Sequence, residues 1–202
     1  MKKRLIYNPQ NLFWVKGAKP RFKKMTVHYM LDLETASTAK NAAILSIACV
    51  KFTFPECKPG EVFYRRIDPS FYDNFATSFS VSVGTVQWWM TQETSVRNEA
   101  WGGKGSLDSA LEDFCAFMAE EDIRVWAHGK DFDPPILENA LKVFNRPVPW
   151  KFYQTRDTRT VYELGDIKPV PVEEYPKHHP VGDCQSQIVA LKKSMNSIFK
   201  KV

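Results

Sequence analysis

The order of apolar and polar positions predicts three strands in the first third of the chain. Runs of apolar and β-branched residues cover Val27–Glu34, Ala43–Phe54 and Val62–Ile67, a composition that favours strands. The turn-forming stretch Asp68-Pro69-Ser70 follows the third run and breaks the pattern. Three strands are therefore expected before the first helix.

The rest of the chain alternates between helical spacing and one further strand. A short apolar strand is predicted at Ile123–Ala127, between two amphipathic segments. The predicted helical segments are Val83–Gln92, Ser106–Glu121, Asp133–Phe144, Arg156–Leu164 and Asp183–Phe199, with a glycine-rich loop at 101–105 and a proline-rich loop at 165–180. This order predicts an α/β protein with a mixed sheet and helices on its faces.

The composition is that of one folded domain. The 202 residues are 44% hydrophobic and 13% aromatic, which is enough for a core and argues against disorder. No apolar run approaches the roughly 20 residues that span a bilayer, and Asn8-Pro9-Gln10-Asn11 interrupts any signal-peptide core. The four cysteines are scattered and form no CxxC pair, so we expect a soluble protein of the reducing cytoplasm.

The positive charge is concentrated at the N-terminal end. Of the 28 basic residues, eight lie in residues 1–25 together with no acid, which leaves 20 basic against 23 acidic residues in the remainder. We therefore divide the chain into a basic arm, residues 1–26, and a domain, residues 27–202. A phosphate-rich partner would favour such an arm. A solvated terminus that only aids solubility explains it equally well.

Two carboxylates, Asp32 and Glu34, interrupt the apolar first strand. Residues two apart on a strand point to the same face, so we expect them side by side, with Met30, Leu31 and Leu33 packed around them. Like charges this close in an apolar setting need a counter-charge, and hard oxygen ligands suit Mg²⁺ or Mn²⁺. A strand end at which both carboxylates simply reach water is the alternative.

Two further acids stand where helices are predicted to begin. Asp133 opens the middle helix, and Asp183 opens the last helix, five residues after His178. Either aspartate could instead serve only as a helix cap or first-turn acid. A zinc site made of His178, His179 and Cys184 is a weaker alternative, because it supplies only three ligands.

The order of these motifs is more specific than any one of them. D-x-E on the first strand, F-D at the middle helix and H-x4-D at the last helix resemble the DEDDh 3′–5′ exonuclease superfamily, the RNase T and DnaQ-like enzymes. From Tyr29 to Ile198 the sequence most resembles the branch of phage-type exonuclease A and RNase T-like exoribonucleases. The resemblance implies an RNase H-like fold, a five-stranded mixed sheet flanked by helices. One departure is Asp131, where many relatives carry Asn.

The resemblance also implies the chemistry. Two Mg²⁺ or Mn²⁺ ions would be held by the four acids, and a histidine would take the proton from the attacking water. By position these residues are Asp32, Glu34, Asp133, Asp183 and His178, and the five-residue spacing to Asp183 favours His178 over His179. The implied reaction is hydrolysis of single-stranded nucleic acid, RNA or DNA, from the 3′ end to nucleoside 5′-monophosphates. RNase T-like relatives include dimers, so a homodimer is a possible assembly.

Substrate contacts are harder to derive from the sequence. Thr35 directly follows Glu34 and could offer its hydroxyl or backbone to a terminal nucleotide, while Phe132 offers a ring on which a base could stack. In so aromatic a chain, a given ring more often belongs to the core. A catalytically silent nucleic-acid-binding module and a small-molecule phosphodiesterase or oligonucleotide trimmer remain as alternative functions.

Overall fold

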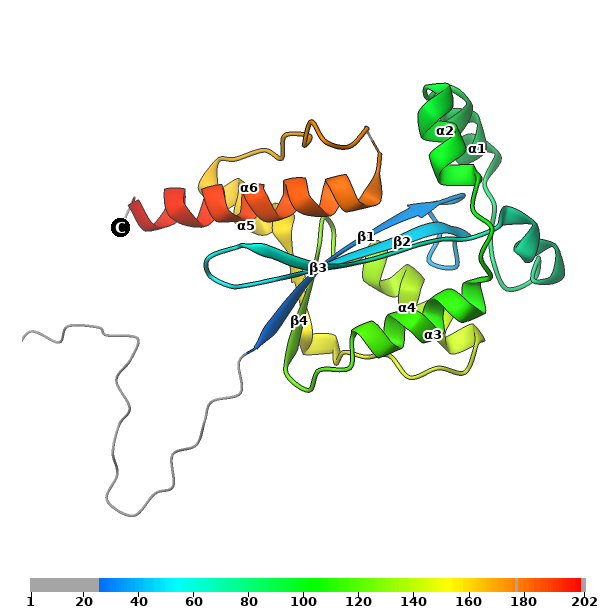
Figure 1. Ribbon diagram of the computed structural model, residues 1–202, viewed down its shortest axis with the longest axis horizontal. Helices are drawn as coiled ribbons and strands as arrows, with labels where there is room; N and C mark the ends of the chain where they lie inside the picture. The colour runs from blue at the N-terminus through cyan, green and yellow to red at the C-terminus, as the bar shows by residue number, and fades with distance from the viewer. Residues whose placement is uncertain (1–25, 177, 201–202) are drawn as a thin grey trace, which may run out of the picture.

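A five-stranded mixed sheet forms the centre of the domain (Figure 1). The computed structural model describes residues 26–176 and 178–200, so the predicted basic arm lies outside the described residues except for Thr26. Across the sheet the described strands are β3 (Pro59–Arg66), β2 (Ile44–Phe52), β1 (Val27–Thr35), β4 (Ile123–Ala127) and β5 (Thr155–Asp157). The β3–β2 and β2–β1 pairs are antiparallel, and the β1–β4 and β4–β5 pairs are parallel. The predicted fold class is thereby confirmed.

Helices cover both faces of this sheet (Figure 1). One face carries α3 (Leu107–Phe117) and α4 (Asp133–Val143), and the other carries α5 (Thr158–Gly165) and α6 (Pro180–Lys200). The shorter elements are η1 (Pro69–Asn74), α1 (Val83–Met90), α2 (Thr94–Trp101) and η2 (Phe152–Gln154). Near the C-terminal end of β1, α1 and α2 stand together (Figure 1). Within the described ranges, no helix combines the length and apolar character that a membrane crossing requires.

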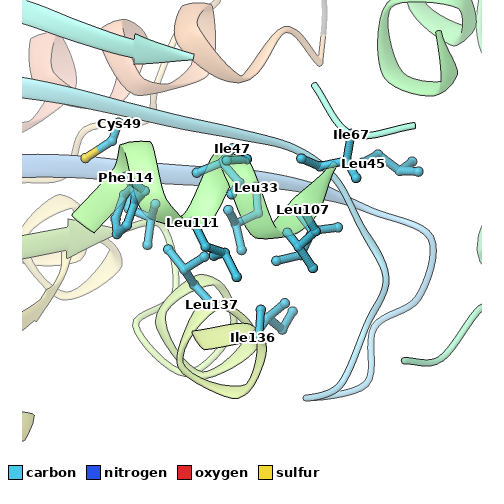
Figure 2. Close-up of a cluster of buried hydrophobic side chains, with 14 of the residues drawn as sticks. Leu33, Leu45, Ile47, Cys49, Ile67, Leu107, Leu111, Phe114, Ile136 and Leu137 are labelled. Carbon is cyan, nitrogen blue, oxygen red and sulfur yellow. The ribbon is translucent and has the colours of Figure 1, made fainter. Parts of the chain in front are cut away.

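The central strand β1 divides its side chains between two cores. Leu31 and Leu33 are buried in the larger core. Figure 2 shows Leu33 in this core together with side chains of α3 and α4. Met30 is buried in the smaller core, which it shares with α6. Asp32 and Glu34 lie two and four residues after Met30 on the strand, so their side chains point to the same face as Met30, the face covered by α6. The expectation that Leu31 and Leu33 pack around the carboxylates was wrong, because both leucines point to the opposite face.

Several element boundaries differ from the prediction for local reasons. The sequence did not predict α2, because only two of its eight residues are buried and its helical periodicity is weak. The segment expected to be helical from Arg156 begins as β5, and α5 starts after Asp157, whose side chain accepts a hydrogen bond from the Arg159 N–H. The last helix begins three residues early, at Pro180, because proline is well accepted in the first turn.

Candidate active site

Carboxylates from three elements meet at one cavity. This acidic cavity, of about 330 Å³, is lined by all four acids singled out in the sequence and by His178. Asp32 and Glu34 come from β1, Asp133 from the start of α4, and Asp183 from the first turn of α6. The alternating faces of β1 direct its two acids to the same side, and the first turns of α4 and α6 both border the cavity.

Asp133 is tied to the strand that carries the other acids. Its Oδ1 accepts a hydrogen bond from the Leu33 backbone N–H at 3.1 Å, and only 4% of the residue is exposed. Phe132 occupies the N-cap position of α4 and makes no side-chain cap bond. The carboxylate therefore joins α4 to β1, which a simple capping role would not require.

His178 closes the cavity from the loop before α6. Glu34, His178 and Asp183 each offer one ligand atom, and these three atoms lie within 4.8 Å of one another. His178 has a positive φ of 57°, and its ring packs edge-on against Trp88 with the ring centroids 5.1 Å apart. Among the described residues this is the group of metal-binding side chains that comes closest together.

The adjacent histidine points elsewhere. His179 Nε2 lies 3.8 Å from Glu99 Oε1, and its ring packs between Tyr64 and Tyr175, at centroid distances of 5.1 and 4.7 Å. Cys184 is fully buried, and its thiol donates to the Met30 carbonyl oxygen at 3.3 Å. The three residues of the zinc alternative thus face different surroundings and do not form one site.

Burial and mutual repulsion keep these carboxylates from ionising together. Burial raises the pKa of Asp32 well above its ordinary value, and Asp133, Glu34 and Asp183 raise it further. The pKa of Glu34 is raised in the same way, by burial and then by Asp183 and Asp133. Burial also raises the pKa of Asp133 to about 7 and raises that of Asp183. Divalent cations would remove this repulsion, so the residues present fit such ions.

Three further polar residues line the acidic cavity and were not singled out from the sequence. They are His128, Ser186 and Gln187. The Gln187 amide donates to Asp32 Oδ1 at 2.9 Å. Gln187 lies one helical turn after Asp183, and that spacing, which places both on one helix face, was the available signal. Nothing comparable in the sequence marks His128, which directly follows β4.

A second cavity, of about 380 Å³, adjoins the acidic one and is called here the base cavity. It is lined by Thr35, Phe132 and Trp88, among others, and shares Leu33, Glu34 and Phe132 with the acidic cavity. The Thr35 hydroxyl donates to the Ser37 carbonyl oxygen at 2.7 Å, so its oxygen, and not its proton, is left for a ligand. Both predicted substrate-binding residues therefore lie beside the acids.

Asp131 and two tryptophans near the site differ in their surroundings. Asp131, the departure from the family pattern, pairs with Lys130 at 3.0 Å and lines neither cavity. Trp126 is buried, and its indole N–H donates to His28 Nδ1 at 2.9 Å. This tryptophan belongs to the core, whereas Trp88 is 42% exposed at the base cavity.

Comparison with known families decides the relationship. The sequence model of the Rv2179c-like 3′–5′ exoribonuclease domain matches residues 27–195. The chain belongs to this family. The match confirms the resemblance to the DEDDh-type 3′–5′ exonuclease superfamily and supports nuclease activity. The comparison with curated protein sequences gave no match.

Solved structures of exonuclease I share the fold of this exoribonuclease-family domain. A product-bound exonuclease I is 14% identical with a TM-score of 0.61, over 88% of this chain and 46% of that chain. The enzyme from Methylocaldum szegediense is 11% identical with a TM-score of 0.62, over 85% and 40%. E. coli exonuclease I in complex with a 5cy-dT13 oligonucleotide is 13% identical with a TM-score of 0.63, over 88% and 43%. The chain spans less than half the length of these proteins, and the likeness confirms an RNase H-like fold.

Proposed function

We propose that this protein is a metal-dependent 3′–5′ exonuclease that hydrolyses single-stranded nucleic acid to nucleoside 5′-monophosphates. The observation that carries the proposal is the set of four carboxylates and one histidine around a single cavity, in a chain of an exoribonuclease family. The family description makes RNA the first substrate to test. DNA is the second, because a solved exonuclease I of the same fold holds a dT13 oligonucleotide.

Asp32, Glu34, Asp133 and Asp183 would hold two Mg²⁺ or Mn²⁺ ions. Their oxygen ligands suit these hard cations, and the raised pKa values of the four carboxyl groups indicate a site that is short of positive charge. When bound, such ions would neutralise the scissile phosphate and promote ionisation of the attacking water. Asp32 is the carboxyl group whose pKa the other three acids all raise.

The protein's own side chains would orient the reactants and move the proton. His178 faces Glu34 and Asp183, so an imidazole nitrogen could accept the proton of a water held on that side. Asp133, which is hydrogen-bonded to the Leu33 backbone, would face the departing 3′-oxygen. Gln187 fixes the carboxylate of Asp32 through its amide, which keeps that group aligned for both partners.

The base cavity would receive the 3′-terminal nucleoside. Phe132 and the half-exposed Trp88 supply π-faces for a base. Thr35 is held by bonds at its hydroxyl and its carbonyl oxygen, the latter accepting from the Trp89 indole N–H at 3.0 Å. A rigid Thr35 could then accept a hydrogen bond from the terminal sugar at its hydroxyl oxygen.

A catalytically silent nucleic-acid-binding module is the second candidate. The presence of the complete set of acids and a histidine in one cavity argues against it. Incubating matched 5′-labelled RNA and DNA oligomers with Mg²⁺, Mn²⁺ or EDTA separates the two. A metal-dependent ladder that shortens from the 3′ end supports the exonuclease, and tight binding without cleavage supports the module. The homodimer and the cytoplasmic location stay predictions, which sedimentation equilibrium and cell fractionation test.

A further inference from the structure

Three cavities follow one another across the site. The base cavity shares Leu33, Glu34 and Phe132 with the acidic cavity, and a third cavity, of about 650 Å³, shares His128 and Pro169 with it. The base cavity and the third cavity have no lining residue in common. The acidic cavity therefore lies between them. This is the order in which the 3′ end of a strand presents a terminal nucleoside, a scissile phosphate and the next nucleotide.

The third cavity contains a guanidinium group that has no partner in the described part of the chain. The other described arginines all use their guanidinium groups in hydrogen bonds within the protein; they are Arg65, Arg66, Arg97, Arg124, Arg146 and Arg156. Within residues 26–176 and 178–200, Arg159 donates only through its backbone N–H, to Asp157 Oδ1 at 2.9 Å. A free guanidinium offers donors in a fork that matches the geometry of a phosphate.

The backbone at Gly129 leaves room for this group beside the end of β4. Gly129 has a positive φ of 109°, and a Cβ atom there would lie 3.0 Å from Arg159 Nη1, so glycine leaves room for the guanidinium at the end of β4. Burial raises the pKa of Asp133, and Arg159 is one of the groups that oppose this rise. Burial lowers the pKa of His128, and Arg159 lowers it further. The guanidinium is thus close enough to act electrostatically on both residues.

We propose that the third cavity is the subsite for the nucleotide on the 5′ side of the scissile bond, and that Arg159 binds the internucleotide phosphate that follows it in the 5′ direction. The inference rests on the proposed function, because Asp133 marks the side of the departing 3′-oxygen. The strand continues in the 5′ direction from that oxygen. Arg159 lines the cavity that shares His128 and Pro169 with the acidic cavity, and so lies where the next phosphodiester must pass.

The charges that line the third cavity favour the binding of one phosphate and give the cavity no net attraction for polyanions. Besides Arg159, the cavity is lined by one more cation, Lys168, and by the carboxylates Glu163 and Asp166. These charges balance, so binding depends on the guanidinium itself. We therefore expect this subsite to contribute to substrate binding only through the charge of one internucleotide phosphate.

The experiment compares two trinucleotides that differ at this phosphate. Both carry a 2′-deoxynucleoside at the first position; one has an ordinary phosphate between the first and second nucleosides, and the other has a neutral methylphosphonate there. Cleavage of the bond before the third nucleoside is measured for the wild type, Arg159→Gln and Arg159→Lys. Arg65→Gln is the matched control, because Arg65 pairs with Asp113 of α3 on the opposite face of the sheet.

We expect the methylphosphonate and the loss of Arg159 to lower kcat/KM by the same interaction, so that their effects do not add. The methylphosphonate lowers kcat/KM of the wild type by roughly 10- to 100-fold, the range for a hydrogen bond to a charged group, and Arg159→Gln on the ordinary substrate loses a similar factor. Arg159→Gln is then insensitive to the methylphosphonate, Arg159→Lys is intermediate, and Arg65→Gln behaves as the wild type. If Arg159→Gln still responds fully to the methylphosphonate, the inference is wrong although the exonuclease stands. If the wild type cleaves neither trinucleotide, the proposed function and the inference both fall.

Discussion

The backbone N–H of Leu33 in β1 donates a hydrogen bond to Asp133 Oδ1 at the start of α4, at 3.1 Å. The bond joins residues 100 positions apart and sets the distance between Asp133 and the two acids of β1. It also occupies one oxygen of Asp133 with a structural role, so that the other oxygen is left for a cation. The same carboxylate thus serves both the fold and the proposed chemistry.

Substitution of Asp133 should separate these two roles. Asp133→Asn keeps an oxygen that can accept from Leu33 and loses the charge, whereas Asp133→Ala also leaves the buried N–H without a partner. We expect both variants to lose nuclease activity by at least roughly 100-fold, as when one electrostatic group is removed from a site. Asp133→Ala should in addition be less stable than Asp133→Asn by about 1–3 kcal/mol. Urea unfolding of the two variants measures this difference, and equal stabilities would show that the bond to Leu33 contributes nothing.

Removal of a charge from the acidic cavity should stabilise the protein when no metal is present. An acid whose pKa is raised by folding contributes most stability below its ordinary pKa, which is 3.8 for Asp32, and that contribution is lost as the pH rises toward the raised value. Asp32→Asn removes this loss of stability and also relieves Glu34 and Asp133 of electrostatic repulsion by Asp32. The thermal midpoint of Asp32→Asn should therefore exceed that of the wild type in EDTA, by a margin that grows from pH 4 to pH 7.

Addition of Mn²⁺ should reverse this ranking, because the ions stabilise the charged wild-type site more than the variant. The difference between the two proteins is the quantity to follow, since other titrating groups such as His28 affect both equally. A difference in thermal midpoint between the two proteins that is constant with pH, or that persists in saturating Mn²⁺, would contradict the electrostatic account of the cavity.

The two adjacent histidines should differ sharply in their effect on turnover. His178→Asn suits the left-handed backbone at this position, where φ is 57°, and removes the proposed base. We expect kcat to fall by about 10²- to 10⁴-fold while KM changes little. His179→Asn is the matched control and should retain most of kcat, because His179 faces Glu99 and not the cavity. Equal losses in the two variants would argue that the histidines act only through the shape of the loop.

Gln187 should act through Asp32. Gln187→Met preserves the length of the side chain and removes the amide that donates to Asp32 Oδ1. Loss of such a supporting bond typically lowers metal affinity or activity by roughly 10- to 100-fold. Gln185→Met, two residues away on α6 and outside the cavity lining, is the control. A Mn²⁺ titration of activity with both variants tests this, and an unchanged midpoint and rate for Gln187→Met would remove Gln187 from the account.

The sequence predicted best what depends on local period. The shared face of Asp32 and Glu34 followed from the alternation of a strand, and the sheet with its flanking helices followed from the order of apolar patterns. The convergence of Asp133 and Asp183 with them did not follow from spacing, because it depends on how α4 and α6 pack; it came from the resemblance to a family.

Other features depended on contacts that leave no mark in the sequence. Nothing in the pattern distinguishes Arg159, whose guanidinium has no hydrogen-bond partner among the residues that the structure describes, from Arg156, whose guanidinium bonds to the carbonyl oxygens of Tyr153 and Thr155. The position of His128 beside the acids is likewise a result of the β4 to α4 connection. The helix α2 was missed because only Val96 and Ala100 of its eight residues are buried, too few to form an apolar stripe.

The central claim is that this site releases nucleotides from a 3′ end by hydrolysis at phosphorus. It is tested most directly by digesting a defined single-stranded RNA in ¹⁸O-labelled water with Mn²⁺ and analysing the products by mass spectrometry. We predict nucleoside 5′-monophosphates that are released from the 3′-terminal residue first and carry one ¹⁸O in each phosphate. The Asp32→Asn variant should form no nucleoside monophosphates. Nucleoside 3′-phosphates, internal fragments, or equal release by Asp32→Asn would contradict it.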